Sequence, residues 1–111
     1  MRYLAIPYSG QEELSYETSL KICAHWMKKG ILVFSPVIHN HPLDSLVQGS
    51  HEFWMILDFW FLDRCNEVIV VMNPDYLQSK GVTAEIQRAI LKGIPVRYFT
   101  AKEILNEIRD Q

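Results

Sequence analysis

Short apolar runs alternate along the chain with longer segments in which apolar residues recur at helical spacing. Four of the runs are short, rich in aliphatic and aromatic residues and bounded by turn residues, a pattern that predicts buried strands. They occupy residues 2–8, 31–37, 67–73 and 94–99. Amphipathic spacing and cap residues predict helices at residues 12–29, 50–64 and 82–92, and a last helix after Thr100. The polar segment 38–49, which contains Pro42, is predicted to be a loop.

This alternation of strands and helices predicts an α/β fold with a parallel sheet, because each right-handed crossover places a helix on a face of the sheet. We expect a flavodoxin/Rossmann-like three-layer sandwich with a parallel sheet of four to five strands in the order 2-1-3-4. Ligands of such sheets bind outside the carboxyl ends of the strands, here at the switch point between the first and third strands. The loops at residues 7–10 and 73–81 meet there, so they are predicted to form the site.

Composition narrows the class of partner. The 111 residues, 49% hydrophobic and 22% charged, are typical of one packed domain spanning residues 1–111. The net charge of −2 gives no attraction for a nucleic-acid polymer or an anionic membrane, so a small ligand is expected. The apolar run at residues 53–62 is shorter than the roughly 18 to 20 residues that span a bilayer. Cys23 and Cys65 have no disulfide or zinc spacing, which indicates a reducing cytoplasm.

The run at residues 53–62, FWMILDFWFL, sets one carboxylate, Asp58, among nine apolar residues. Burying an unpaired charge is costly, so Asp58 either belongs to a site or lies on a solvated polar edge of the helix. Such an edge would be shared with Glu52, Asp63 and Arg64. If partly buried, it has a raised pKa and can hold a proton near neutral pH, as a general acid requires. Trp54 and its aromatic neighbours either stack on a ligand or pack in the core and against another subunit.

Residues 79–86 run from the predicted third loop into a helix. Ser79 and Gly81 at a helix N-terminus offer free backbone N–H groups and the positive end of the helix dipole, which favour an anion such as a phosphate. Glu85 follows one turn later, where it can point at a bound sugar and attack its anomeric carbon. The alternative is that Glu85 is a favourable first-turn acid and Ser79 only a cap.

Two histidines, His39 and His41, flank Asn40 in the segment predicted to be a loop. Alternate residues of an extended segment face the same way, and Asp44 or His51 could add ligands, but the spacing matches no zinc site. We therefore predict no metal site, and we expect the histidines to line a base pocket or to face solvent.

Five stretches form a longer pattern that covers nearly the whole chain. They are YLAIPYSG, HP at residues 41–42, W-x3-D-x3-L from Trp54, CNEVIVV, and SKGVTAEIQRAILKGIPV. Together they resemble the nucleoside 2-deoxyribosyltransferase-like superfamily, and in particular a group of small bacterial and phage proteins within it. The most specific stretch is S-x-G-x3-E at Ser79, Gly81 and Glu85. It is similar to the pattern of the 2′-deoxynucleoside 5′-monophosphate N-glycosidases.

The resemblance implies roles for single residues. Glu85 matches the glutamate that attacks the anomeric carbon and forms a covalent glycosyl-enzyme, Asp58 the aspartate that handles the base or its proton, and Tyr3 a tyrosine that orients the glutamate. Ser79 matches a serine that contacts the 5′-phosphate. The loop after the first strand departs from the phosphate-handling branch because it has no arginine, which leaves Lys80 as the only nearby cation. The resemblance implies no cofactor.

The substrate-binding residues expected from the loops and the resemblance are Pro7, Tyr8, Ser9, Gly10, His39, His41, Trp54, Ser79, Lys80 and Gly81. The resulting prediction is an enzyme that cleaves or transfers the N-glycosidic bond of a (deoxy)nucleoside or nucleoside monophosphate through a covalent intermediate on Glu85. One alternative is a non-catalytic module that binds or senses a nucleotide or sugar phosphate, and another is an assembly unit with a degenerate pocket. Relatives complete the pocket with a neighbouring subunit, so a homo-oligomer is expected.

Overall fold

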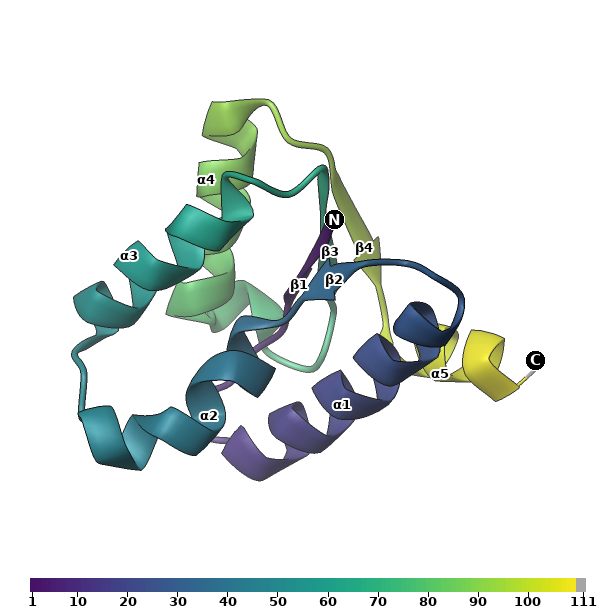
Figure 1. Cartoon of the computed structure of the whole chain (residues 1–111), viewed down its shortest axis with the longest axis horizontal. Coiled ribbons are helices and arrows are strands. Elements are labelled where there is room, and N and C mark those ends of the chain that lie inside the picture. Colours follow the sequence, from purple (N-terminus) through teal and green to yellow (C-terminus); the bar gives the residue numbers. More distant parts are fainter. Residues whose placement is uncertain (110–111) are drawn as a thin grey trace.

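Strands and helices alternate along most of the chain (Figure 1), and the computed structural model describes residues 1–109. The strands are β1 (Arg2–Ala5), β2 (Val33–Phe34), β3 (Glu67–Val71) and β4 (Val96–Phe99). The helices are α1 (Glu12–Lys28), α2 (Pro36–Val47), α3 (His51–Leu62), α4 (Lys80–Lys92) and α5 (Ala101–Arg109), with a 3-10 turn at Tyr76–Gln78 before α4. Within residues 1–109, no helix combines the length and the apolar character that crossing a bilayer requires.

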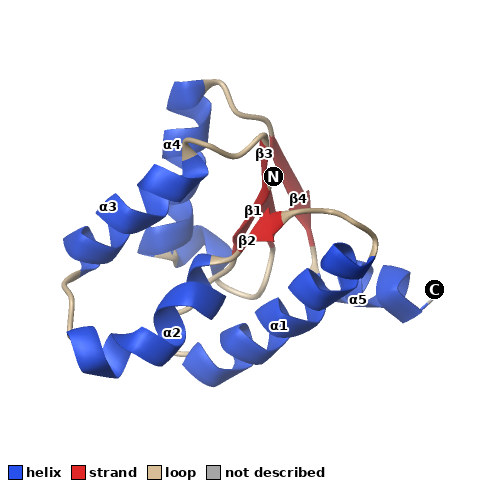
Figure 2. Ribbon diagram, viewed as in Figure 1, coloured by secondary structure: helices blue, strands red, loops and turns tan. Residues whose placement is uncertain are grey.

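The four strands form one parallel sheet in the order β2-β1-β3-β4, which confirms the predicted fold class and strand order. Arg2 of β1 lies opposite Val33 of β2 on one side and Glu67 of β3 on the other, and Val68 of β3 lies opposite Val96 of β4. Helices α1 and α5 lie on one face of the sheet and α3 and α4 on the other, as Figures 1 and 2 show. The sheet is therefore the middle of three layers.

Successive residues of the central strands supply two separate cores, because side chains alternate between the faces of a sheet. Leu4 and Ile69 pack with residues of α1 and α5 on one face. Tyr3 and Val68 pack with residues of α3 and α4 on the other face. This alternation decides which helices Tyr3 can reach, and it directs the phenol toward α4.

The segment predicted to be a loop is largely the helix α2, so that prediction was wrong. Ser35 caps the helix by accepting the backbone N–H of Ile38 at 3.1 Å. Pro36 stands in the first turn, where no N–H is needed, and Pro42 is tolerated inside the helix. The chain leaves α2 at Gln48, whose φ of 54° is in the left-handed region.

The second strand is shorter than predicted because α2 begins early. β2 is limited to Val33–Phe34, whereas a strand over residues 31–37 was expected. Pro36 has no N–H to extend the ladder and its fixed φ suits the first turn of a helix. The early turn brings α2 over the carboxyl end of β1, beside the predicted site.

Candidate functional site

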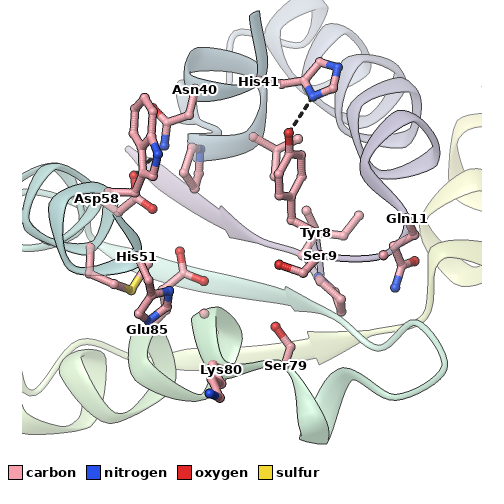
Figure 3. A pocket seen from close by; sticks show the side chains of 18 of the residues that line it. Tyr8, Ser9, Gln11, Asn40, His41, His51, Asp58, Ser79, Lys80 and Glu85 are labelled. Carbon is pink, nitrogen blue, oxygen red and sulfur yellow. Dashed lines mark hydrogen bonds between the residues drawn. The ribbon is translucent and has the colours of Figure 1, made fainter. Parts of the chain in front are cut away.

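A cavity of about 860 Å³ opens at the carboxyl ends of β1 and β3, within the range of small-ligand pockets. Its walls come from the segment after β1, from α2 and α3, and from the segment leading into α4. Figure 3 shows Asp58 and Glu85 on one side of it, Tyr8 and His41 across from them, and Ser79 with Lys80 along a third side. The cavity thus lies at the predicted switch point.

Glu85 reaches the cavity from the buried stripe of α4. Val82, Glu85 and Ala89 are the buried residues of that helix, and their spacing places them on one face. Only 4% of Glu85 is exposed, and Tyr3, which is fully buried, donates its hydroxyl hydrogen to Oε2 of the carboxylate. Tyr3 does not itself line the cavity, so it contacts Glu85 from the buried core between the sheet and α4.

Burial raises the pKa of Glu85 to about 8. The hydrogen bond from Tyr3 opposes this shift because it stabilises the carboxylate, whereas the nearby Asp58 adds to it by charge repulsion. Burial and the same two carboxyl groups raise the pKa of Tyr3 well above its ordinary value. Tyr3 therefore remains a neutral hydrogen-bond donor across the physiological pH range.

Asp58 is also buried, with 5% of the residue exposed. It shares the buried stripe of α3 with Leu62, one turn further along the helix. Asn40 of α2 donates its amide Nδ2–H to Oδ1 of Asp58 at 2.9 Å. Burial raises the pKa of Asp58 to about 6, and the shift is limited by the Asn40 hydrogen bond and by the positive potential of His39 and His51. Asp58 lies in a site and not on a solvated polar edge.

The two carboxyl groups line one cavity, and burial raises the pKa of both, to about 6 for Asp58 and to about 8 for Glu85. The sequence led us to expect that Asp58 keeps a proton and that Glu85 is ionised. The structure gives Glu85 the higher pKa because the carboxyl group on α4 is the more deeply desolvated. The raised pKa values favour one acid and one carboxylate together near neutral pH, with burial opposing the ionised form of Glu85 more strongly than that of Asp58.

A chain of polar contacts forms the opposite wall of the cavity. His41 of α2 lies with Nε2 at 2.8 Å from Oε1 of Glu13 and with Nδ1 at 2.6 Å from the hydroxyl of Tyr8. Tyr16 stacks on the imidazole, with ring centroids 4.5 Å apart. When His41 is neutral and donates from Nε2 to Glu13, Nδ1 accepts the Tyr8 proton, so the Tyr8 oxygen presents lone pairs to a ligand.

Ser79 caps α4 and so has a structural contact of its own. Its Oγ accepts the backbone N–H of Val82 at 3.2 Å. Helix α4 begins at Lys80, two residues before the predicted start, and Lys80 and Gly81 form its first turn. The Lys80 side chain is exposed and has no ion-pair partner in the described part of the chain.

The loop after β1 is held against α1. Ser15, which is fully buried on α1, donates its hydroxyl hydrogen to the carbonyl of Pro7. Gly10 adopts a φ of 87°, which favours glycine, and its N–H donates to Oε2 of Glu12 at 2.5 Å. The loop therefore presents Tyr8 and Ser9 to the cavity from a fixed backbone.

The structure brings most of the predicted residues into one cavity. Those that line it are Pro7, Tyr8, Ser9, Gly10, His41, Trp54, Asp58, Ser79, Lys80, Gly81 and Glu85. His39 is exposed and lies outside the lining, against the rings of Phe34 and Phe61. Within residues 1–109, no cluster of three or more potential metal ligands is present.

Sequence reasoning missed the functional position of several lining residues, among them Asn40, Asp44, Glu52 and Asp75. Asn40 and Asp44 are one turn apart on α2 and so share a face, a relation that reading the segment as a loop concealed. A Ser-Pro pair at residues 35–36 was the available signal for a helix start.

The fold and the cavity define an α/β protein with a ligand-sized site at the switch point of its sheet and a buried carboxyl pair in that site. The chain belongs to the DUF1937 family, a domain of unknown function, whose family model matches residues 1–101. No curated protein matches the chain.

Proposed function

We propose that this protein cleaves or transfers the N-glycosidic bond of a (deoxy)nucleoside or nucleoside monophosphate. The observation that carries the proposal is the buried pair Glu85 and Asp58 in one cavity, with Tyr3 bonded to Glu85 from behind. The resemblance of the S-x-G-x3-E stretch to N-glycosidases supports the same reaction class. A pair that holds one proton and one charge near neutral pH is what a nucleophile and a general acid require.

In this reaction, Glu85 attacks the anomeric carbon, the carbon–nitrogen bond breaks, and its electron pair leaves with the base. Asp58 supplies the proton that a neutral base needs on departure, so the proton held by the pair must lie on Asp58 at that moment. Water or a second base then attacks the anomeric carbon and releases Glu85 as a carboxylate, while Asp58 takes up the incoming proton. Tyr3 keeps Glu85 oriented and stabilises its charge through the buried hydrogen bond.

The test is incubation with a panel of deoxynucleosides, ribonucleosides and their 5′-monophosphates, with free base measured by chromatography. We expect base release that falls by about 10³-fold or more in Glu85→Gln, because the nucleophile is lost while the shape is kept. Glu17→Gln is the matched control, since Glu17 is an exposed acid of α1 outside the cavity. Equal release by the wild type and Glu85→Gln would refute the proposal.

A second candidate is a module that binds a nucleotide or sugar phosphate without turnover. The raised pKa of Glu85 favours it, because a carboxyl group that is mostly protonated at neutral pH is a poor nucleophile in the free protein. Thermal stabilisation by a nucleotide, with no base released from any member of the panel, would identify this function.

We further propose that the protein forms a homo-oligomer in the cytoplasm. The support for an oligomer is a row of exposed apolar residues on α3, Phe53, Ile56 and Trp60, which are 47%, 74% and 53% exposed. Their spacing places them on one face of the helix, away from the sheet. The support for the cytoplasm is that Cys23 and Cys65 are both buried free thiols.

A further inference from the structure

The lining of the cavity contains many more acids than bases. Its carboxyl groups are those of Asp44, Glu52, Asp58, Asp75 and Glu85, and they come from α2, α3, α4 and the loop before α4. Lys80 is the only lysine in the lining, which contains no arginine, and the other groups that can carry positive charge are His41 and His51. Acidic side chains therefore outnumber the groups that can carry positive charge in this lining.

These acids are also free of cationic partners. None of the five forms an ion pair within the described residues 1–109. The arginines that do pair with acids bind Asp63 and Glu67, outside the cavity. The Asn40 hydrogen bond to Asp58 and the Tyr3 hydrogen bond to Glu85 leave one oxygen of each carboxyl group without a hydrogen-bond partner. Two buried carboxyl groups thus keep capacity for a positively charged ligand.

Aromatic side chains in the same lining suit the same kind of ligand. Tyr8 and Trp54 both border the cavity, and aromatic faces attract cations, most strongly where water is excluded. A 5′-phosphate near the start of α4, by contrast, would lie in a lining that contains Asp75, with Lys80 as its single lysine. The Oγ of Ser79 accepts a hydrogen bond from the backbone of α4 and keeps its O–H free to donate, so Ser79 alone does not favour or disfavour a phosphate.

We propose that the ligand of this cavity is an unphosphorylated glycoside whose aromatic base carries a positive charge, such as a pyridinium or N-alkylated purine riboside. This inference rests on the proposed function, because it names the substrate class of the same site. A cationic base also fits the protonation of the pair. A positive charge beside Glu85 and Asp58 favours the ionised form of both, and so turns Glu85 into a nucleophile when the ligand arrives.

The reaction of such a substrate balances without a general acid. Glu85 forms a bond to the anomeric carbon, the carbon–nitrogen bond breaks, and its electron pair neutralises the base, which leaves uncharged. In the second step water attacks the anomeric carbon, the bond to Glu85 breaks and Glu85 leaves as a carboxylate. The proton of the attacking water passes to Asp58, which is ionised at that stage.

The test uses three probes that differ mainly in charge: nicotinamide riboside, its uncharged dihydropyridine form, and nicotinamide mononucleotide. We expect calorimetric titration of the wild-type chain at pH 7 and low salt to show the cationic riboside binding about 10-fold or more tightly than either other probe. This preference should shrink at 0.5 M salt, because ions screen the exposed acids. Equal or tighter binding of the uncharged or phosphorylated probe overturns the inference, as does the absence of binding by all three.

Variants in which an amide replaces an acid test whether the acids, and not other features of the cavity, cause the preference for the cationic probe. Glu52→Gln and Asp75→Asn should each lower the preference for the cationic over the uncharged probe by about 2- to 5-fold, and Glu17→Gln should leave it unchanged. A variant that carries both substitutions should lose still more of the preference, and an unchanged preference in that variant overturns the inference.

Release of nicotinamide from the bound riboside is a separate measurement. Preferred binding of the cation, without base release from it or from any member of the nucleoside and monophosphate panel, refutes the proposed enzyme function and leaves the ligand class standing. Base release that is faster from neutral nucleosides or monophosphates than from the cationic riboside supports the enzyme function and overturns the proposed ligand class.

Discussion

Glu85 combines two demands that conflict in a single residue. It must be ionised to attack a sugar, but 96% burial and a neighbouring carboxyl group favour its protonated form. Tyr3 relieves part of the conflict by donating a hydrogen bond from the interior of the sheet. Burying Glu85 therefore lowers the free energy of unfolding by an amount that depends on pH.

The first prediction concerns this cost. The pKa of Glu85 rises from 4.5 to about 8 on folding, so the native state is disfavoured as pH rises from about 4.5 through 8. Below pH 4.5 the effect is absent because the group is protonated in both states. Glu85→Gln should then match the wild type at pH 4 and exceed its free energy of unfolding by about 3 to 5 kcal/mol at pH 9. Urea denaturation at both pH values measures this, and a variant that is less stable at pH 9 contradicts it.

The second prediction concerns Asn40 and Asp58. Because the hydrogen bond from Asn40 stabilises the carboxylate, Asn40→Ala should raise the pKa of Asp58 above its value of about 6. Carbon-13 NMR of labelled aspartate follows this titration directly. If the protein is an enzyme, the acid limb of its pH–rate profile should move up by the same amount. An unchanged or lowered pKa shows that the two side chains do not interact in solution, and His39→Ala serves as a comparison for the weaker charge effect.

Glu85 could be proposed as a site residue from its place in S-x-G-x3-E, and Asp58 from its position as the one carboxylate in an apolar run. Tyr3 was proposed only from the resemblance to a known superfamily. The order of the pKa values of Asp58 and Glu85 could not be predicted from the sequence. The order of the two pKa values depends on how deeply each group is buried and on the donors from Asn40 and Tyr3, which are 18 and 82 residues away in the chain.

At the level of elements, helix caps position the cavity walls. Ser35, Ser50 and Ser79 each accept a backbone N–H at the start of α2, α3 and α4, the three helices that line the site. The cap of α2 was not recognised from the sequence because Pro42 and the polar residues around it are more typical of a loop. Tertiary packing of Val37 in the core overrides that local preference.

The third prediction tests the cap of α4. Ser79→Ala should lower the free energy of unfolding by about 1 kcal/mol, because the N–H of Val82 loses its acceptor. Ser79→Asp should stay within about 0.5 kcal/mol of the wild type, since aspartate caps as well as serine. Denaturant titration at pH 7 compares the two, with the exposed residue change Thr83→Ala as the control. Equal stability of Ser79→Ala and the wild type contradicts a capping role.

At the scale of the whole molecule, the sheet order and the place of the cavity followed from the alternation of strands and helices. Right-handed crossovers leave few arrangements for four parallel strands, and the switch point of the order 2-1-3-4 lies between β1 and β3. The shape of the cavity did not follow, because α2 contributes a wall that the sequence pattern did not reveal. Surface residues such as Ile56 likewise show their exposure only in the folded chain.

The fourth prediction concerns assembly. If the row Phe53, Ile56 and Trp60 is an interface between copies, a charge in its middle should disrupt it. Ile56→Glu should sediment as a single chain at micromolar concentrations at which the wild type sediments as a dimer or larger species. Leu91→Glu is the control, because Leu91 is an exposed residue of α4 remote from that row in the sequence. A wild type that sediments as one chain at all concentrations contradicts the proposal.

The two sides of the cavity have different origins in the chain. Tyr3 and Glu85 belong to β1 and α4, which meet in the buried core, whereas Asn40, His41 and Asp58 all lie on the uninterrupted stretch α2–α3. One wall of the cavity and the carboxylate proposed to attack the sugar therefore lie on separate segments of the chain. Exchanging residues 36–58 while Asn40 and Asp58 are kept would therefore alter one wall of the cavity and leave Glu85 and Tyr3 in place.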